Sequence, residues 1–250
     1  MKPIINQWRQ YMKETNVARA GMEREVKIAA AMNEFFIANN IELAAVAAGG
    51  AGHGSDVVVN NAAGEVVDTY EVKTSKGSRI DFGQFRAAFD PSEGWIQATG
   101  LDNDVVRVIF SEIKDTLDSQ VVPKGDGFPR GPRLSTDLAT EFWASALGRP
   151  REKSLSGDVV RIPVSPNLIQ DYYRKKGDEY IIMGDDVYSL SDDGILMSLS
   201  EALRECYVVF RVKYHGKNTY SYTAALRGKF TDTQETDFAR AIRKIYTGDQ

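Results

Sequence analysis

Cysteine and histidine are scarce in this chain of 250 residues. The single cysteine, Cys206, excludes a disulfide within the chain and a cysteine-ligated zinc site. The two histidines, His53 and His215, are too few for a histidine-rich metal site and argue against a Ser-His-Asp triad. These absences remove three common kinds of functional site from consideration.

Long apolar runs and an excess of positive charge are also missing. No stretch approaches the length needed to span a bilayer, and the first residues lack the apolar core of a signal peptide. We therefore expect a cytoplasmic protein with no membrane partner. The net charge of −4 argues against a protein that simply coats DNA, because such proteins are basic overall. It does not argue against an enzyme whose metal site gathers acids and whose basic surface is local.

Two acids and a lysine stand on neighbouring predicted strands. Asp56 begins a β-branched segment, the residues at 60–64 form a turn cluster, and a second strand then carries Glu71 and Lys73. Because side chains alternate along a strand, Glu71 and Lys73 point to one face and Val72 to the other. A hairpin closed by the turn brings Asp56 alongside the face that carries Glu71 and Lys73.

This trio has a specific chemistry. Carboxylates from adjoining strands form the oxygen site that Mg²⁺ prefers, and the metal polarises a phosphoryl group. We expect Asp56, Glu71 and the Val72 carbonyl to hold Mg²⁺, for which Mn²⁺ would substitute. Lys73 would then position and activate the attacking water. The alternative is a surface hairpin on which Glu71 and Lys73 form a solvated pair.

The same residues resemble the motif of the PD-(D/E)xK nuclease superfamily, the restriction-endonuclease-like fold. Asp56 matches the family's first acid, and Glu71 and Lys73 match its D/E-x-K triplet. Ser55 stands where the family has proline, at a position that carries no chemistry. The sequence Gly-Met-Glu-Arg-Glu at 21–25 is similar to the G-x-x-x-E helix start of several branches. The resemblance covers residues 21–86 and does not name a subfamily.

The resemblance implies an α/β fold of mixed α+β type, with a central mixed β-sheet flanked by helices and a β-rich C-terminal half. It also implies a Mg²⁺-dependent DNA endonuclease that leaves a 5′-phosphate and a 3′-hydroxyl. We favour a sequence-specific, restriction-type homodimer, since two sites related by a twofold axis cut both strands. The alternatives are a branched-DNA or junction-cleaving nuclease, and a non-catalytic nucleic-acid-binding module on the same fold.

A third carboxylate is expected from the helix that precedes the motif. The apolar residues of the predicted helix at 15–38 recur at a helical spacing that includes Glu25, so this side chain lies on the buried stripe. A buried carboxylate is costly unless it is paired or binds a metal. We expect Glu25 to join the site, with Glu23 as its substitute; the alternative is that Glu25 pairs with a lysine at the edge of the stripe.

Other residues are candidates for contact with DNA. The glycine-rich segment at 47–54 matches no nucleotide-binding motif, and we expect it to let the backbone approach DNA or to form a loop. Polar and basic residues that follow Lys73, and a Gly/Pro-rich basic loop at 124–133, would bind phosphates or read base edges. The candidates are Ser75, Gln84, Arg86, Arg130 and Arg133.

The remaining patterns predict an alternation of helices and strands. We expect a nuclease core over 1–150 and an α+β region over 151–250 for DNA recognition or dimerisation, either separate or integrated with the core. The predicted helices are 15–38, 81–89, 102–119, 135–147, 165–176, 200–205 and 233–246, with a strand at 105–110 as the alternative within the third. The predicted strands are 41–48, 94–99 and the hairpins at 55–75, 179–190 and 207–226.

Overall fold

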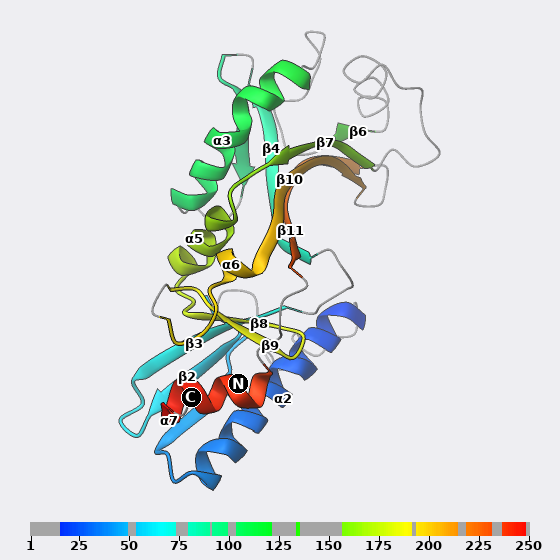
Figure 1. The fold of residues 1–250 in the computed structure, drawn as a ribbon. Helices are drawn as coiled ribbons and strands as arrows, with labels where there is room; N and C mark the ends of the chain where they lie inside the picture. The colour runs from blue at the N-terminus through cyan, green and yellow to red at the C-terminus, as the bar shows by residue number, and fades with distance from the viewer. Residues whose placement is uncertain are drawn as a thin grey trace, which may run out of the picture. The chain divides into compact units, whose positions relative to one another are not determined.

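The computed structural model describes residues 16–49, 54–73, 80–90, 92–99, 104–121, 134–135, 157–191, 194–214, 219–231 and 237–248. These residues form helices and two β-sheets, which is the mixed α+β class expected from the sequence (Figure 1). They fall into two compact units. The first lies within Met1–Ser75, Lys176–Leu199 and Thr233–Gln250, and the second within Lys76–Lys175 and Ser200–Asp232. The expected boundary at residue 150 does not coincide with these units.

The first unit contains a five-stranded mixed sheet in the order β1-β2-β3-β8-β9. Among the described strand pairs of this sheet, only β3–β8 is parallel, with Tyr70 beside Tyr180 and Lys73 beside Met183. A parallel pair needs a long crossover connection, and this one contains Lys76–Lys175, the longer stretch of the second unit. The elements of the first unit are α2 (Asn16–Ala38), β1 (Leu43–Ala47), β2 (Val57–Asn61), β3 (Val66–Lys73), β8 (Tyr180–Met183), β9 (Asp186–Ser189) and α7 (Phe238–Thr247).

Helices α2 and α7 cover one face of this sheet. Met32 and Phe36 of α2 are buried against strand residues such as Tyr70 and Ile182, together with Ala241 and Ile242 of α7. Helix α7 begins at its N-cap Asp237, whose side chain accepts a hydrogen bond from the Ala239 amide. One face of the sheet is thus closed by two helices that are far apart in the sequence.

The second unit contains a curved antiparallel sheet in the order β5-β4-β11-β10-β7, and the short β6 pairs with β11. Phe85 of this sheet packs edge-on against Tyr172 of α5, and Trp95 packs against Phe210 and Tyr222. The elements are β4 (Ile80–Asp90), β5 (Gly94–Thr99), α3 (Asp104–Gln120), β6 (Leu134–Ser135), β7 (Gly157–Pro163), α5 (Pro166–Lys176), α6 (Leu199–Ala202), β10 (Leu203–Tyr214) and β11 (Thr219–Phe230).

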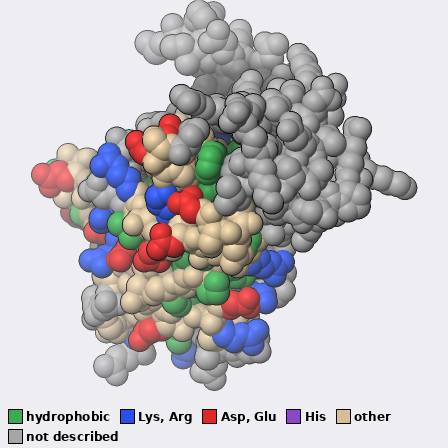
Figure 2. Space-filling view, turned by 90° about the horizontal axis from the view of Figure 1, so that it is seen from above, with side chains coloured by type: hydrophobic (Ala, Val, Ile, Leu, Met, Phe, Trp, Pro, Cys, Tyr) green, Lys and Arg blue, Asp and Glu red, His purple; other side chains and the backbone are tan. Residues whose placement is uncertain are grey.

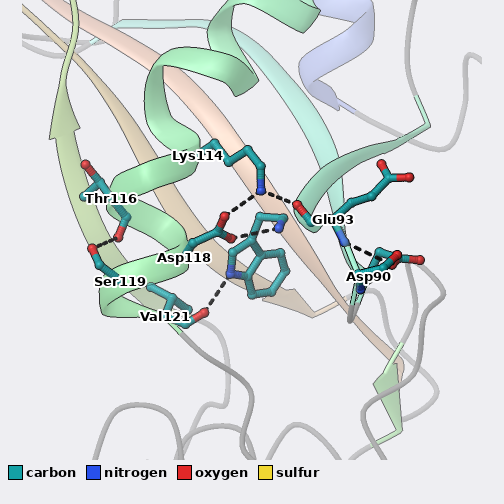
Figure 3. A network of polar contacts seen from close by, with 9 residues as sticks. Asp90, Glu93, Lys114, Thr116, Asp118, Ser119 and Val121 are labelled. Atoms are coloured by element: carbon teal, nitrogen blue, oxygen red, sulfur yellow. Dashed lines mark hydrogen bonds and ion pairs between the residues drawn. The ribbon is translucent and has the colours of Figure 1, made fainter.

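A polar network fixes α3 to β5 (Figure 3). The buried Trp95 donates its backbone amide to Asp118 at 3.0 Å and its indole N–H to the Val121 carbonyl at 2.7 Å. Lys114 bridges Asp118 and the Glu93 carbonyl. Gly94, the first residue of β5, has a φ of 79°, and a Cβ at this position would also overlap Asp118.

Several predicted elements are confirmed, and others are wrong. The helices expected at 15–38, 102–119 and 165–176 are α2, α3 and α5, and the hairpins expected at 55–75, 179–190 and 207–226 are β2–β3, β8–β9 and β10–β11. The helix predicted at 81–89 is strand β4. The helix predicted at 200–205 ends at Ala202, and the closing helix begins at Phe238. Of the helix predicted at 135–147, only Ser135 is described, and it lies in β6.

No helix in the described residues is both long and apolar enough to cross a membrane. On the face drawn in Figure 2, lysine and arginine side chains are interspersed with aspartate and glutamate, and no single sign dominates. A surface on which one sign of charge predominates would therefore stand out from this background.

Candidate active site

Asp56 is held between two strands of the first unit. It immediately precedes β2, its amide donates to the Tyr70 carbonyl at 3.0 Å, and its carbonyl accepts from the Ala48 amide at 2.9 Å. Its carboxylate oxygen Oδ2 accepts a hydrogen bond of 2.8 Å from the Val72 amide. The antiparallel pairing of β2 with β3 therefore places the first acid beside the Glu-Val-Lys triplet.

Glu71 and Lys73 lie on one face of β3, as the alternation of the strand predicts. Val72 points away from them and packs against the core of the first unit. Lys73 Nζ pairs with Glu71 Oε1. The alternative of a solvated surface pair does not describe this geometry, because the Glu71 side chain is only 4% exposed.

A second lysine binds the other oxygen of Glu71. Lys176, the last residue of α5, contacts Glu71 Oε2, and its side chain is 17% exposed. The next turn is fixed to β3, because the Thr69 hydroxyl donates to the Gly177 carbonyl at 2.8 Å and the Glu179 amide donates to the Thr69 carbonyl at 3.1 Å. Gly177 has a φ of 99°, so glycine suits this helix end.

Asp178 is the most buried carboxylate of this region. Its side chain is 0% exposed, and Lys176 Nζ lies 3.7 Å from its Oδ2. The Ser55 side chain acts on this carboxylate and lowers its pKa, but no well-formed hydrogen bond to either oxygen is present in the described chain. We call Glu25, Asp56, Glu71, Lys73, Lys176 and Asp178 the carboxylate–lysine cluster.

Glu25 of α2 faces this cluster, whereas Glu23 is exposed. The Glu25 carboxylate lies against the backbone of Gly49, where a Cβ would overlap it. The glycine-rich segment thus has a specific role at this residue, which is to leave room for a carboxylate. Gly54 lies close to the Lys176 carbonyl, and residues 50–53 are outside the described part of the chain.

The cluster contains more carboxylates than lysines, and the pKa values of several of its carboxyl groups are shifted accordingly. Burial, followed by the charges of Asp56 and Glu71, raises the pKa of Glu25 to about 7. Burial and Glu71 raise the pKa of Asp56 as well. Burial raises the pKa of Asp178 to about 6, although Lys176 opposes the shift. Burial alone would lower the pKa of Lys176, but the charges of Glu71 and Asp178 outweigh it and raise that pKa.

The donor chemistry of the cluster fits a divalent cation. In the described chain, no three His, Cys, Asp or Glu side chains are already arranged around a metal position. However, the carboxylates are oxygen ligands of the kind that Mg²⁺ and Mn²⁺ bind. The raised pKa values of Glu25, Asp56 and Asp178 mark a deficit of positive charge. A cation bound by Glu71 would replace one of its lysine contacts.

The other predicted residues lie elsewhere. Gln84 and Arg86 are exposed on β4 of the second unit, on a strand and not on the expected helix. Ser75, Arg130 and Arg133 are outside the described residues. The structure therefore brings together Glu25, Asp56, Glu71 and Lys73, with the backbone of Val72, and no other predicted site residue is described within the first unit.

Sequence analysis missed Lys176 and Asp178. In the sequence, Lys176 belongs to the basic run Arg174-Lys175-Lys176, and such a run is usually a solvated surface. The available signal was the glycine after the run, which ends the helix, followed by the apolar strand β8. If β8 is placed parallel to β3 with Tyr180 beside Tyr70, the residues just before β8 lie close to Glu71 in the neighbouring strand.

Comparison with models of known protein families, with curated proteins and with solved structures finds no match to this chain. Function must therefore be inferred from the carboxylate–lysine cluster and its surroundings.

Proposed function

We propose that this chain is a metal-dependent DNA endonuclease that hydrolyses phosphodiester bonds. The observation that carries the proposal is the meeting of Asp56, Glu71 and Lys73 with Glu25 at one end of the first sheet. These are the residues of the PD-(D/E)xK resemblance. The hairpin β2–β3 by itself explains why Asp56, Glu71 and Lys73 lie close together. Glu25 joins them because helix α2 packs against the same sheet.

Each residue of the carboxylate–lysine cluster would have a distinct role in this reaction. Asp56 and Glu71 would bind Mg²⁺ or Mn²⁺, with the Val72 carbonyl, Glu25 and Asp178 as further oxygen donors. When bound, the metal supplies polarisation of the phosphoryl group and a lower pKa for a bound water. Lys73 holds its ammonium beside Glu71, where it can orient a water and stabilise negative charge on the phosphate. Lys176 keeps the second oxygen of Glu71 in a fixed direction.

Within this class we favour a sequence-specific homodimer of the restriction type. Two copies related by a twofold axis would place one cluster on each DNA strand. A junction-cleaving nuclease is the alternative enzyme, since the helix that carries Glu25 also resembles that branch.

One observation favours a non-catalytic binding module. Both oxygens of Glu71 are paired with lysines, which is also how a purely structural ion-pair cluster would satisfy a buried carboxylate. The two accounts differ for Asp178, because a purely structural cluster does not need a buried carboxylate that has Lys176 at 3.7 Å and Ser55 nearby but no well-formed hydrogen bond.

The decisive test is cleavage of supercoiled plasmid and genomic DNA with Mg²⁺. Replacing Lys73 by alanine should lower the cleavage rate by about 10²-fold or more, the usual size of a general acid–base contribution. Chelation of the metal should abolish cleavage. Lys175→Ala is the matched control, since Lys175 is exposed, and it should leave the rate unchanged.

The products separate the alternatives. Discrete bands that are lost in Lys73→Ala indicate a sequence-specific enzyme, and a smear indicates a nonspecific one. Preferential cleavage of branched substrates indicates the junction-directed enzyme. Absence of metal-dependent cleavage on plasmid, branched and single-stranded DNA would overturn the proposal and leave the binding module.

A further inference from the structure

The ammonium group of Lys176 bridges two carboxylates that come from different parts of the first unit. It pairs with Oε2 of Glu71, on β3, and it lies 3.7 Å from Oδ2 of Asp178, which stands two residues before β8. The charge of Asp56 acts on the same ammonium group. Because the Lys176 side chain is only 17% exposed, water and salt screen these charges weakly.

The carboxylate–lysine cluster has more negative than positive charge. It contains four carboxylates and two lysines, so it carries two negative charges when every group is ionised. One divalent cation would cancel this excess. The ammonium group of Lys176 supplies only half the charge of Mg²⁺, and it makes fewer contacts than an octahedral metal ion. The position that Lys176 bridges therefore has the charge and the oxygen donors to take a divalent cation in place of the ammonium group.

The two lysines of the cluster act on different carboxylates besides Glu71. Both pair with Glu71, Lys73 through Oε1 and Lys176 through Oε2. Beyond this shared partner, the charge of Lys176 acts on Asp178, whereas that of Lys73 acts on Glu25. A cation that displaced Lys176 would therefore leave Lys73, the residue proposed to orient water, beside Oε1 of Glu71.

The Lys176 side chain can leave this position without a change in the main chain. Lys176 is the last residue of α5, and the next residue, Gly177, is fixed to β3 because the Thr69 hydroxyl donates to its carbonyl at 2.8 Å. The ammonium group stands at the end of a flexible stem, so rotation of side-chain bonds is enough to move it. Exchange of the ammonium group for a metal ion thus requires only a change of rotamer.

We propose that the Lys176 ammonium group occupies a metal position in the metal-free protein, and that a divalent cation displaces it from Glu71 and Asp178. The inference rests on the metal site of the proposed function and gives this lysine a second role. Without metal, Lys176 holds Glu71 and Asp178 together in spite of their like charge, and it fixes the direction of Glu71. As a competitor of the metal, it also sets the metal concentration at which the cluster fills.

Binding of Mn²⁺ to the full chain without DNA tests this exchange, with free Mn²⁺ measured by electron paramagnetic resonance. Lys176→Met should tighten Mn²⁺ binding by about tenfold or more, because the metal no longer competes with an ammonium group for the same oxygens. Lys73→Met is the matched control. It removes the same charge from the other oxygen of Glu71, and it should have a smaller effect. Lys175→Met, at an exposed residue, should have none.

Amine labelling of the unaltered protein gives a second measurement that does not depend on the folding of any variant. The extent of labelling at Lys176, measured by mass spectrometry, should rise several-fold at saturating Mg²⁺, because the displaced ammonium group becomes accessible. Labelling of the exposed Lys175 should stay constant and serves as the internal control.

The proposal is overturned if Lys176→Met binds Mn²⁺ no more tightly than the unaltered chain, or if Lys73→Met tightens binding equally. It is also overturned if Lys176 stays protected from labelling at saturating metal, or if the unaltered chain binds no divalent cation. Metal exchange at Lys176 in a protein that never cleaves DNA would uphold the inference and overturn the nuclease. Metal-dependent cleavage by a protein in which Lys176 stays protected would do the reverse.

Discussion

At the scale of single residues, Asp178 costs the folded protein free energy. It is buried, its carboxylate oxygens have no well-formed hydrogen bond in the described chain, and burial raises its pKa to about 6 although Lys176 and Ser55 oppose the shift. A carboxyl whose pKa is higher in the folded state than in the unfolded state binds protons more tightly when folded. The protein therefore loses stability as the pH rises through the interval between the two values.

Asp178→Asn should stabilise the metal-free protein. The pKa rises from 3.8 to about 6, and one unit corresponds to about 1.4 kcal/mol, so the free energy of unfolding at pH 8 should increase by about 3 kcal/mol. Below pH 4 the gain should vanish. Urea unfolding in EDTA at several pH values measures this.

The same variant should cleave DNA more slowly, because it removes an oxygen donor from the cluster. A more stable protein with lower activity would mark Asp178 as a functional residue. If Asp178→Asn instead destabilises the protein at pH 8, the carboxylate serves mainly to pair with Lys176.

Residues close in sequence were predictable, and distant ones were not. Asp56, Glu71 and Lys73 belong to one hairpin, so strand alternation and a turn signal suffice to bring them together. Glu25 required a helical stripe, and its spacing was visible. Lys176 and Asp178 reach the cluster only through the parallel pairing of β3 with β8, which no local pattern reports.

At the scale of elements, Gly49 fixes the approach of α2 to the end of β1. A side chain at this position would overlap the Glu25 carboxylate. The carboxylate is the end of a flexible side chain, so it can move aside without unfolding the helix. The glycine therefore matters for the position of Glu25 more than for the fold.

Gly49→Ala should lower the rate of DNA cleavage to about that of Glu25→Gln, and it should change the free energy of unfolding by less than about 1 kcal/mol. Cleavage rates of both variants and of the double variant measure this. The double variant should be no slower than either single one, since both act on one carboxylate.

Gly21→Ala is the control for this experiment. A Cβ at Gly21 would lie 4.0 Å from Glu25 Oε1, an ordinary contact, so cleavage should persist. Equal loss of activity in Gly21→Ala would show that any added methyl disturbs the helix, and full activity in Gly49→Ala would remove Glu25 from the site.

Strand β4 shows why one element was mispredicted. The register of β4 against β11 shifts between Leu226 and Arg227. Gly83 pairs with Leu226 and Asp81 pairs with Arg227, so Phe82 has no partner in β11 and is the extra residue of a β-bulge. The bulge changes the phase of burial, with Ile80 and Phe82 buried before it and Phe85 and Ala87 after it. This spacing resembles one face of a helix, and only the partner strand distinguishes the two.

At the scale of the whole molecule, the first unit is built from three separated stretches of chain. A fragment of residues 1–150, the nuclease core expected from the sequence, would keep Asp56, Glu71 and Lys73. It would lack β8, β9 and α7, and with them core residues such as Ile182 and Ile242.

The 1–150 fragment should therefore fail to fold cooperatively and should not cleave DNA. Circular dichroism during thermal unfolding, together with the plasmid assay, measures this. A cooperative transition in the fragment would show that a stable fold forms without β8, β9 and α7, contrary to the packing described above. The full chain carried through the same preparation is the control.

Because of the long crossover between β3 and β8, the residues of the carboxylate–lysine cluster are synthesised in two groups that are far apart in time. On the ribosome, Asp56, Glu71 and Lys73 emerge long before Lys176 and Asp178, and α7 emerges later still. A chain released early would carry the complete acid–lysine motif but no finished scaffold to hold it. If the finished protein does cut DNA, a prematurely terminated product would therefore pose little danger to the genome of the cell that makes it.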